Sequence, residues 1–182
     1  MSGLDLGAEA PNFDLTSTEG VVLMLRDEVP RSALVLYFFA DPGDEVVRRD
    51  LLALSRRLAD WYELTASVLA ISPAKVDALQ ELQRELKLGF PLLSDDRNFA
   101  RLYGVRPGEG EEEAAPALFL VDRNQKVRWM ANPVGGVEEA LPQIQRELRR
   151  LPSPTANLPR RATNRLIDRW VNQKSGLRKK RA

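Results

Sequence analysis

The chain has 182 residues, and 43% of them are hydrophobic, which is enough for one α/β domain with a sizeable core and an additional segment. It contains no cysteine and no histidine, so it cannot alone supply a thiolate nucleophile, an iron–sulfur ligand, a Ser-His-Asp triad or the usual zinc and haem ligands. The net charge of +1 is unevenly distributed, because residues 1–150 hold 18 Lys and Arg against 25 Asp and Glu, whereas residues 151–182 hold nine against one.

The first third of the sequence predicts a hairpin and then a buried strand. Phe13–Thr18 alternates in polarity, and Val21–Leu25 follows after a Glu-Gly turn, as in a pair of short strands. Leu34–Ala40 is an unbroken apolar run closed by turn residues, which is typical of a central strand buried on both faces. We expect its aromatic residues, Tyr37–Phe39, to pack in the core rather than to line a pocket.

Two amphipathic helices are predicted next, on either side of a second buried strand at Ser67–Ser72. The first runs from Asp44 to near Tyr62, and we expect Trp61 at its end to lie at the rim of the core. Each helix carries one apolar stripe with steps of three and four residues. The stripes are Val47, Leu51, Leu54 and Leu58 in the first helix and Val76, Leu79, Leu82 and Leu86 in the second.

The second half of the predicted domain ends in a hairpin and a helix. Its segments, in order, are an extended piece at Phe90–Asp95, a short helix at Asn98–Tyr103, an exposed loop at Arg106–Ala115, a buried strand at Ala117–Asp122 with its partner at Lys126–Met130, and a helix at Val137–Leu151. The whole order indicates an α/β fold whose central mixed sheet is covered by helices on both faces. We expect a domain at 1–151, a Pro-rich linker at 152–160 and a basic amphipathic helix and tail at 161–182.

Several motifs follow one another in a familiar order. They are G-A-E-A-P-N-F-D-L at 7–15, L-V-L-Y-F-F at 34–39, V-L-A-I-S at 68–72, F-P-L-L-S-D at 90–95, Y-G-V at 103–105 and P-A-L-F-L-V-D-R-N at 116–124. Through these segments the chain resembles the peroxiredoxins of the alkyl hydroperoxide reductase and thiol-specific antioxidant type, and among them the bacterioferritin-comigratory-protein branch. The resemblance implies a thioredoxin-like fold with an N-terminal hairpin, followed here by the basic C-terminal extension.

The resemblance also implies where an active site would lie, and this chain departs from the family there. The family carries a P-x-x-x-T-x-x-C pattern between the central strand and the next helix, with a distant Arg that helps to position the peroxide. Depending on how Pro42 and Gly43 are aligned, either Asp44 or Asp41 stands in place of the cysteine, and the Thr is missing. Pro116 stands near the position of the family's Arg, and its place before a core strand also resembles the cis-proline of thioredoxins.

We therefore interpret these five positions as a degenerate active site, because a carboxylate cannot be oxidised to a sulfenic acid. Thiol peroxidase activity is not expected from this chain alone, and we predict no catalytic residue, cofactor or metal site. Two other readings of Asp41, Asp44 and Glu45 are a general acid/base pair and a metal site. We favour helix capping for Asp44, and for Glu109–Glu113 a solvated loop rather than an acidic docking site.

The C-terminal segment combines a narrow apolar stripe with many cations, a pattern typical of an element that binds a protein partner, an anionic membrane surface or a nucleic acid. An alternative is that it packs on its own acidic domain. The candidate binding residues are Arg161, Arg165, Arg169, Trp170, Lys174, Arg178, Lys179, Lys180 and Arg181.

Our leading hypothesis is a redox-inactive binding or structural subunit that docks through this arm. The alternatives are an oxidoreductase that uses a partner's thiol, a carboxylate-based activity at Asp41 and Asp44, and a nucleic-acid-associated protein. A homodimer is implied by the resemblance. The N-terminal sequence lacks the basic and apolar regions of a secretory signal, and we expect a cytoplasmic protein.

Overall fold

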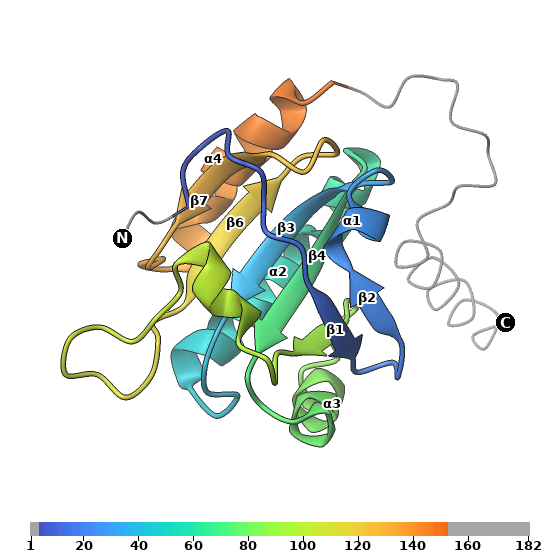
Figure 1. Cartoon of the computed structure of the whole chain (residues 1–182). Coiled ribbons are helices and arrows are strands. Elements are labelled where there is room, and N and C mark those ends of the chain that lie inside the picture. The colour runs from blue at the N-terminus through green and yellow to red at the C-terminus, as the bar shows by residue number, and fades with distance from the viewer. Residues whose placement is uncertain (1–3, 153–182) are drawn as a thin grey trace, which may run out of the picture.

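The computed structural model describes residues 4–152, which form one seven-stranded mixed sheet in the order β2-β1-β5-β4-β3-β6-β7 (Figure 1). The strands are β1 (Asp14–Ser17), β2 (Val22–Met24), β3 (Ala33–Phe38), β4 (Ala66–Ser72), β5 (Leu92–Ser94), β6 (Ala117–Val121) and β7 (Val127–Ala131). The helices are α1 (Leu25–Glu28), α2 (Glu45–Glu63), α3 (Val76–Glu85), the 3₁₀ helix η1 (Phe99–Tyr103) and α4 (Val137–Arg150). Within residues 4–152, no helix has the length and apolar composition that crossing a membrane requires.

The centre of the sheet is formed by the strands that the unbroken apolar runs predicted. β3 lies between β4, to which it is parallel, and β6, to which it is antiparallel. Every residue of β3, β4 and β6 is buried. A strand with neighbours on both edges and covered faces needs apolar side chains in both directions, so the prediction of a buried strand is confirmed for Leu34–Phe38, and Phe39 is buried as well. The strand ends at Phe38, and Ala40 is half-buried. Phe38 and Phe39 also line a cavity, so the expectation that the aromatic residues would not line a pocket was wrong for these two.

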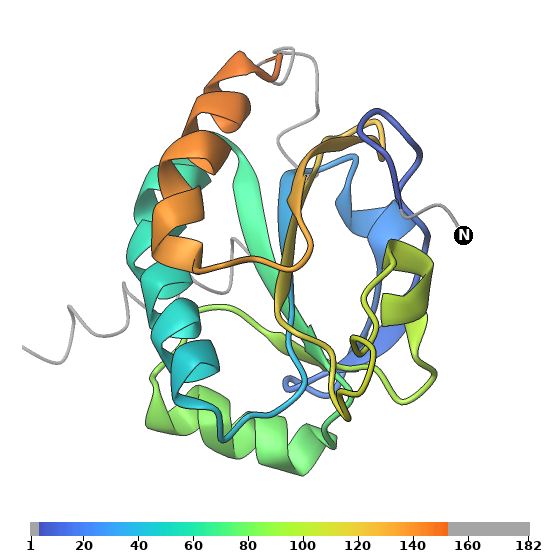
Figure 2. The same ribbon diagram turned by 90° about the vertical axis from the view of Figure 1, so that its left-hand side faces the viewer.

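The two faces of the sheet are covered differently. α2 and α4 lie side by side on one face, whereas the N-terminal segment, α1 and η1 cover the other (Figure 2). On that second face, short segments take the place of the expected amphipathic helices. The hydroxyl of Tyr103 on η1 donates a 2.6 Å hydrogen bond to the carbonyl of Pro11, and its ring packs 4.9 Å from that of Phe38.

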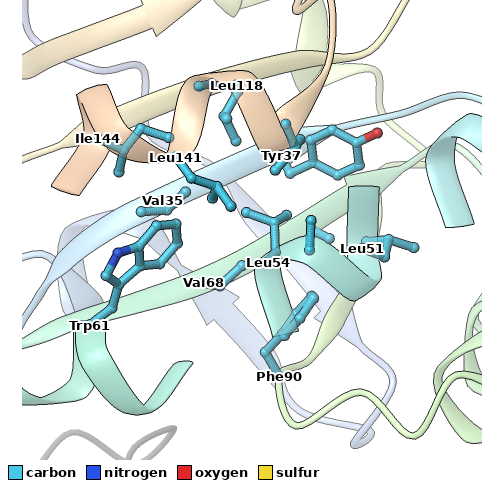
Figure 3. Packing of buried hydrophobic residues seen from close by; sticks show 14 of the residues in the cluster. Val35, Tyr37, Leu51, Leu54, Trp61, Val68, Phe90, Leu118, Leu141 and Ile144 are labelled. Atoms are coloured by element: carbon cyan, nitrogen blue, oxygen red, sulfur yellow. The ribbon is translucent and has the colours of Figure 1, made fainter. Parts of the chain in front are cut away.

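The prediction that Trp61 lies at the rim of the core was wrong. Trp61 is fully buried in the cluster between the sheet and the helices, and Figure 3 shows it among the residues of β3, β4 and α4. Its Nε1 atom donates a 2.7 Å hydrogen bond to Oε1 of Gln145 on α4. The stripe of α2 alone predicts where that helix meets the sheet, but α4 packs along α2 and covers the indole from the side.

Candidate functional site at the carboxyl ends of the central strands

The loop between β3 and α2 is built around two aspartates that satisfy backbone donors. Oδ1 of Asp41 accepts a 2.7 Å hydrogen bond from the amide of Gly43, and Oδ1 of Asp44 accepts one of 2.7 Å from the amide of Val46. Asp44 is therefore the N-cap of α2, as expected, and its charge also suits the positive end of the helix dipole. Both carboxylates are exposed and serve the turn and the cap.

The aspartates of this loop form no metal site in the described part of the chain. Among residues 4–152, no group of three or more acidic side chains is arranged to hold a metal ion. Pro116, which precedes β6, is half-buried, and its carbonyl accepts a 2.7 Å hydrogen bond from the amide of Val134. The resemblance to a cis-proline does not extend to the peptide bond before Pro116, because among the described residues the cis peptide bond is the one between Asn132 and Pro133.

A buried carboxylate that the sequence reading did not single out lies beneath this loop. Asp50 on α2 is 2% exposed, and its Oδ2 atom accepts a 3.0 Å hydrogen bond from the hydroxyl of Tyr37. Its Oδ1 atom accepts a 3.2 Å bond from the amide of Val137, the first residue of α4. The N-cap of α4 is Gly136, which has no side chain, so Asp50 caps α4 from another helix.

Burial governs the protonation of this pair. It raises the pKa of Asp50 above its ordinary value, and the hydrogen bonds from Val137 and Tyr37 oppose that effect. Burial, together with the nearby charge of Asp50, raises the pKa of Tyr37 far above that of a free phenol. Tyr37 is therefore a fixed hydrogen-bond donor rather than an acid near neutral pH, and the arrangement is suited to holding α2, β3 and α4 together.

A cavity of about 330 Å³ opens at the carboxyl ends of β3, β4 and β5, the edge of an α/β sheet where ligands usually bind. In Figure 1 this is the end toward which the arrowheads of β3 and β4 point. The buried part of the lining is mainly apolar. The lining residues are Phe38, Phe39, Ala40, Ile71, Ser72, Pro73, Asp95, Asp96, Asn98, Ala100, Val105, Pro107, Glu112, Glu113 and Ala114.

One wall of the cavity is held by Asp95, which follows β5. Asp95 is 3% exposed, and its two carboxylate oxygens accept hydrogen bonds of 2.8 and 2.9 Å from the amides of Phe99 and Ala100. Its own amide donates a 2.8 Å bond to the carbonyl of Ser72 at the end of β4. Asp95 therefore holds the first turn of η1 against the sheet. Both of its carboxylate oxygens already accept hydrogen bonds from backbone amides.

The predicted acidic loop contributes to this cavity. Pro107 and Ala114 form an isolated antiparallel bridge, so the loop folds back on itself and brings Glu112 and Glu113 to the cavity. Both glutamates are exposed, as expected for this segment. The nine basic and aromatic candidates of the C-terminal arm, by contrast, lie outside the described residues.

Comparison with known proteins decides the family. The AhpC/TSA family profile matches residues 6–130, which is more than half of the chain. The chain belongs to the AhpC/TSA family. This family member contains no cysteine, so it lacks the peroxidatic thiol of a peroxiredoxin.

Individual relatives agree with this assignment. Peroxiredoxin 2 of Picrophilus torridus is 31% identical over 137 residues, which cover 69% of this chain and 64% of that protein, so this chain spans less than two thirds of that relative's length. The putative peroxiredoxin bcp of Helicobacter pylori is 30% identical over 119 residues, or 62% of this chain and 76% of that protein. The crystal structure of peroxidoxin BcpB from Mycobacterium tuberculosis has the same fold, with a TM-score of 0.75 at 20% identity over 82% of this chain and 99% of that one.

Proposed function

We propose that this AhpC/TSA family member is a redox-inactive binding protein. The observation that supports the proposal most strongly is the β3–α2 loop, where both candidates for the position of the family's cysteine, Asp41 and Asp44, accept hydrogen bonds from backbone amides. Asp44 caps α2 and Asp41 closes the turn at Gly43. A carboxylate that already accepts a hydrogen bond from a backbone amide, as both aspartates do, is poorly suited to proton transfer.

Peroxide reduction by the purified full-length chain is the test of this proposal. We expect the consumption of hydrogen peroxide and of an alkyl hydroperoxide, with dithiothreitol or thioredoxin as reductant, to equal that of the reductant alone. The variants Asp41→Asn and Asp44→Asn separate a carboxylate-based activity from background. Turnover that disappears in either variant would establish an enzyme at this loop.

We further propose that the basic C-terminal arm binds a protein partner. Support comes from the sequence, where residues 151–182 carry nine Lys and Arg against one Asp, next to an apolar stripe that contains Trp170. Affinity capture from native cells should recover a partner with the full chain and lose it when Arg178, Lys179, Lys180 and Arg181 are all replaced by Gln. A matched variant that replaces four Arg and Lys residues of the folded domain should keep the partner.

The remaining alternative functions predict different results in assays of the same purified proteins. An oxidoreductase that borrows a thiol would show peroxide turnover only after the captured, cysteine-containing partner is added back. A nucleic-acid protein would bind RNA or DNA with a strong salt dependence that the four-residue Gln variant reduces. We also propose that the protein is a homodimer, which light scattering tests. We propose a cytoplasmic location, which cell fractionation tests.

A further inference from the structure

The cavity at the carboxyl ends of β3, β4 and β5 has the size and composition of a small-molecule site. Its volume of about 330 Å³ lies within the range of ligand pockets in proteins. Phe38, Phe39, Ile71 and Val105 contribute buried apolar surface to its lining. An apolar lining at this sheet edge favours a ligand with an aromatic or aliphatic body over a fully polar one.

The charged residues around the cavity determine which charge the polar group of such a ligand should carry. The exposed carboxylates of Asp96, Glu112 and Glu113 line it, and none of the described lining residues is Lys or Arg. Asp96 lies 4.0 Å from Arg97, which also pairs with Asp14, so part of its charge is balanced. Within residues 4–152 neither Glu112 nor Glu113 forms an ion pair, and their charges remain to attract a ligand cation.

The interior of the cavity offers few free polar groups. The carboxylate of Asp95 accepts from two backbone amides, and the hydroxyl of Ser72 donates a 3.1 Å bond to the carbonyl of Ala40. A ligand that buried several polar atoms there would leave them unpaired, which disfavours its binding. The carboxylates at the exposed part of the lining suit one cationic group close to solvent.

From this combination we infer that the cavity binds a small organic cation, an amine or a guanidinium compound with an apolar aromatic or aliphatic body. The body lies against Phe38, Ile71 and Val105, and the cation faces Glu112 and Glu113. This inference rests on the proposed function, because it names the class of ligand for a protein that binds rather than reduces.

The experiment compares two probes of the same shape and opposite charge, phenethylammonium and 3-phenylpropanoate. Each is titrated into the full-length chain, and methyl and amide NMR shifts are followed. Phenethylammonium should give saturable shifts at Ile71, Ala100, Val105 and Ala114, whereas 3-phenylpropanoate should give none there. Replacing both Glu112 and Glu113 by Gln should weaken the affinity for phenethylammonium about three- to tenfold.

A control with the same loss of charge tests whether the effect is local. Asp60→Asn with Glu63→Gln removes two exposed carboxylates at the carboxyl end of α2, which lies at the opposite end of the sheet because α2 returns antiparallel to β3. The affinity for phenethylammonium should change less than twofold in this variant. An equal loss in both variants would indicate general attraction to an acidic domain and overturn the site.

Three further results would overturn the inference. The first is the absence of saturable shifts at the cavity, and the second is binding of the anionic probe at least as strong as that of the cation. The third concerns the full-length variant in which Arg178, Lys179, Lys180 and Arg181 are replaced by Gln. If phenethylammonium bound only to this variant, the cations of the chain's own basic arm would be the natural ligand of the cavity. A failure of these titrations leaves the peroxide assay unaffected, so it is distinguishable from a failure of the proposed function.

Discussion

The hydroxyl of Tyr37 on β3 donates a 3.0 Å hydrogen bond to Oδ2 of Asp50 on α2, inside the core of the domain. The other oxygen of Asp50 accepts the amide of Val137 at the start of α4. One buried carboxylate thus joins a central strand to both long helices on one face. It lies under the loop where the family would place its thiol, and it serves structure rather than redox chemistry.

Replacing Asp50 by Asn should destabilise the domain by about 1–3 kcal/mol, because an amide can accept one of the two hydrogen bonds but turns a donor toward the other. Tyr37→Phe removes one donor and leaves the cap on α4, so it should cost less, about 1 kcal/mol. Urea unfolding of both single variants and of the double variant measures the coupling. Strict additivity would contradict a direct Tyr37–Asp50 bond.

The stability that Asp50 contributes should depend on pH with a definite sign. Since its pKa is raised in the folded state above the ordinary value of 3.8, the folded protein holds this proton more tightly than the unfolded chain. Stability therefore falls as pH rises from about 4 through the folded pKa, relative to the Asp50→Asn variant. Unfolding free energies of the two proteins measured between pH 3 and 7 test this, and a difference that grows with pH would refute it.

The indole of Trp61 and the amide of Gln145 form a second buried link between α2 and α4. Gln145→Ala leaves the indole N–H without its partner and should cost about 1–2 kcal/mol. The control is Gln143→Ala, which removes the equivalent 3.0 Å bond to the more exposed Trp129 and should change stability by less than about 0.5 kcal/mol. Equal effects of the two substitutions would mean that burial of Trp61 does not matter.

Asp44 should behave as a cap rather than as a catalytic acid. Asp44→Ala is expected to cost about 1 kcal/mol in thermal or urea unfolding, and Asp44→Ser or Asp44→Asn should restore most of it. Glu45, in the first turn of α2, accepts no capping bond in the described structure, so Glu45→Ala is the matched control with a smaller effect. No loss for Asp44→Ala would contradict the cap.

The wall of the cavity should depend on Asp95 and not on its neighbour. Asp95→Ala leaves the amides of Phe99 and Ala100 without an acceptor and should destabilise the domain by about 1–3 kcal/mol. It should also speed amide hydrogen exchange at these two residues. Asp96→Ala, which removes an exposed carboxylate, should leave both quantities nearly unchanged. Unaltered exchange in the Asp95 variant would show that η1 is held by other contacts.

Local patterns predicted most of the elements, while contacts between distant segments explain what was missed. The strand β3 and the cap at Asp44 each depend on residues that are adjacent in the sequence, and both were predicted. Asp50 was missed because its partner Val137 is 87 residues away, although it lies three residues after Val47 and four before Leu54, on the buried stripe of α2. An acid at such a position is the signal that could have identified it.

Two other differences have similar causes. The four residues of α1 are too few to show a helical period, so Leu25 was assigned to the preceding strand and no helix was predicted here. The cavity combines the ends of three strands with the loop that carries Glu112, and no single stretch of sequence brings these parts together. The position of the degenerate loop was predictable from the family motifs, whereas the hydrogen bonds that occupy its aspartates required the structure.

The most direct test of the central claim is a peroxide-consumption assay on the full-length chain, with thioredoxin and its reductase as the reducing system. A cysteine-containing peroxiredoxin in the same assay confirms that the reagents work. The proposal of a redox-inactive binding protein predicts a rate equal to that of the reducing system alone at every peroxide concentration. A rate that is proportional to the concentration of this protein and saturates with peroxide would contradict it.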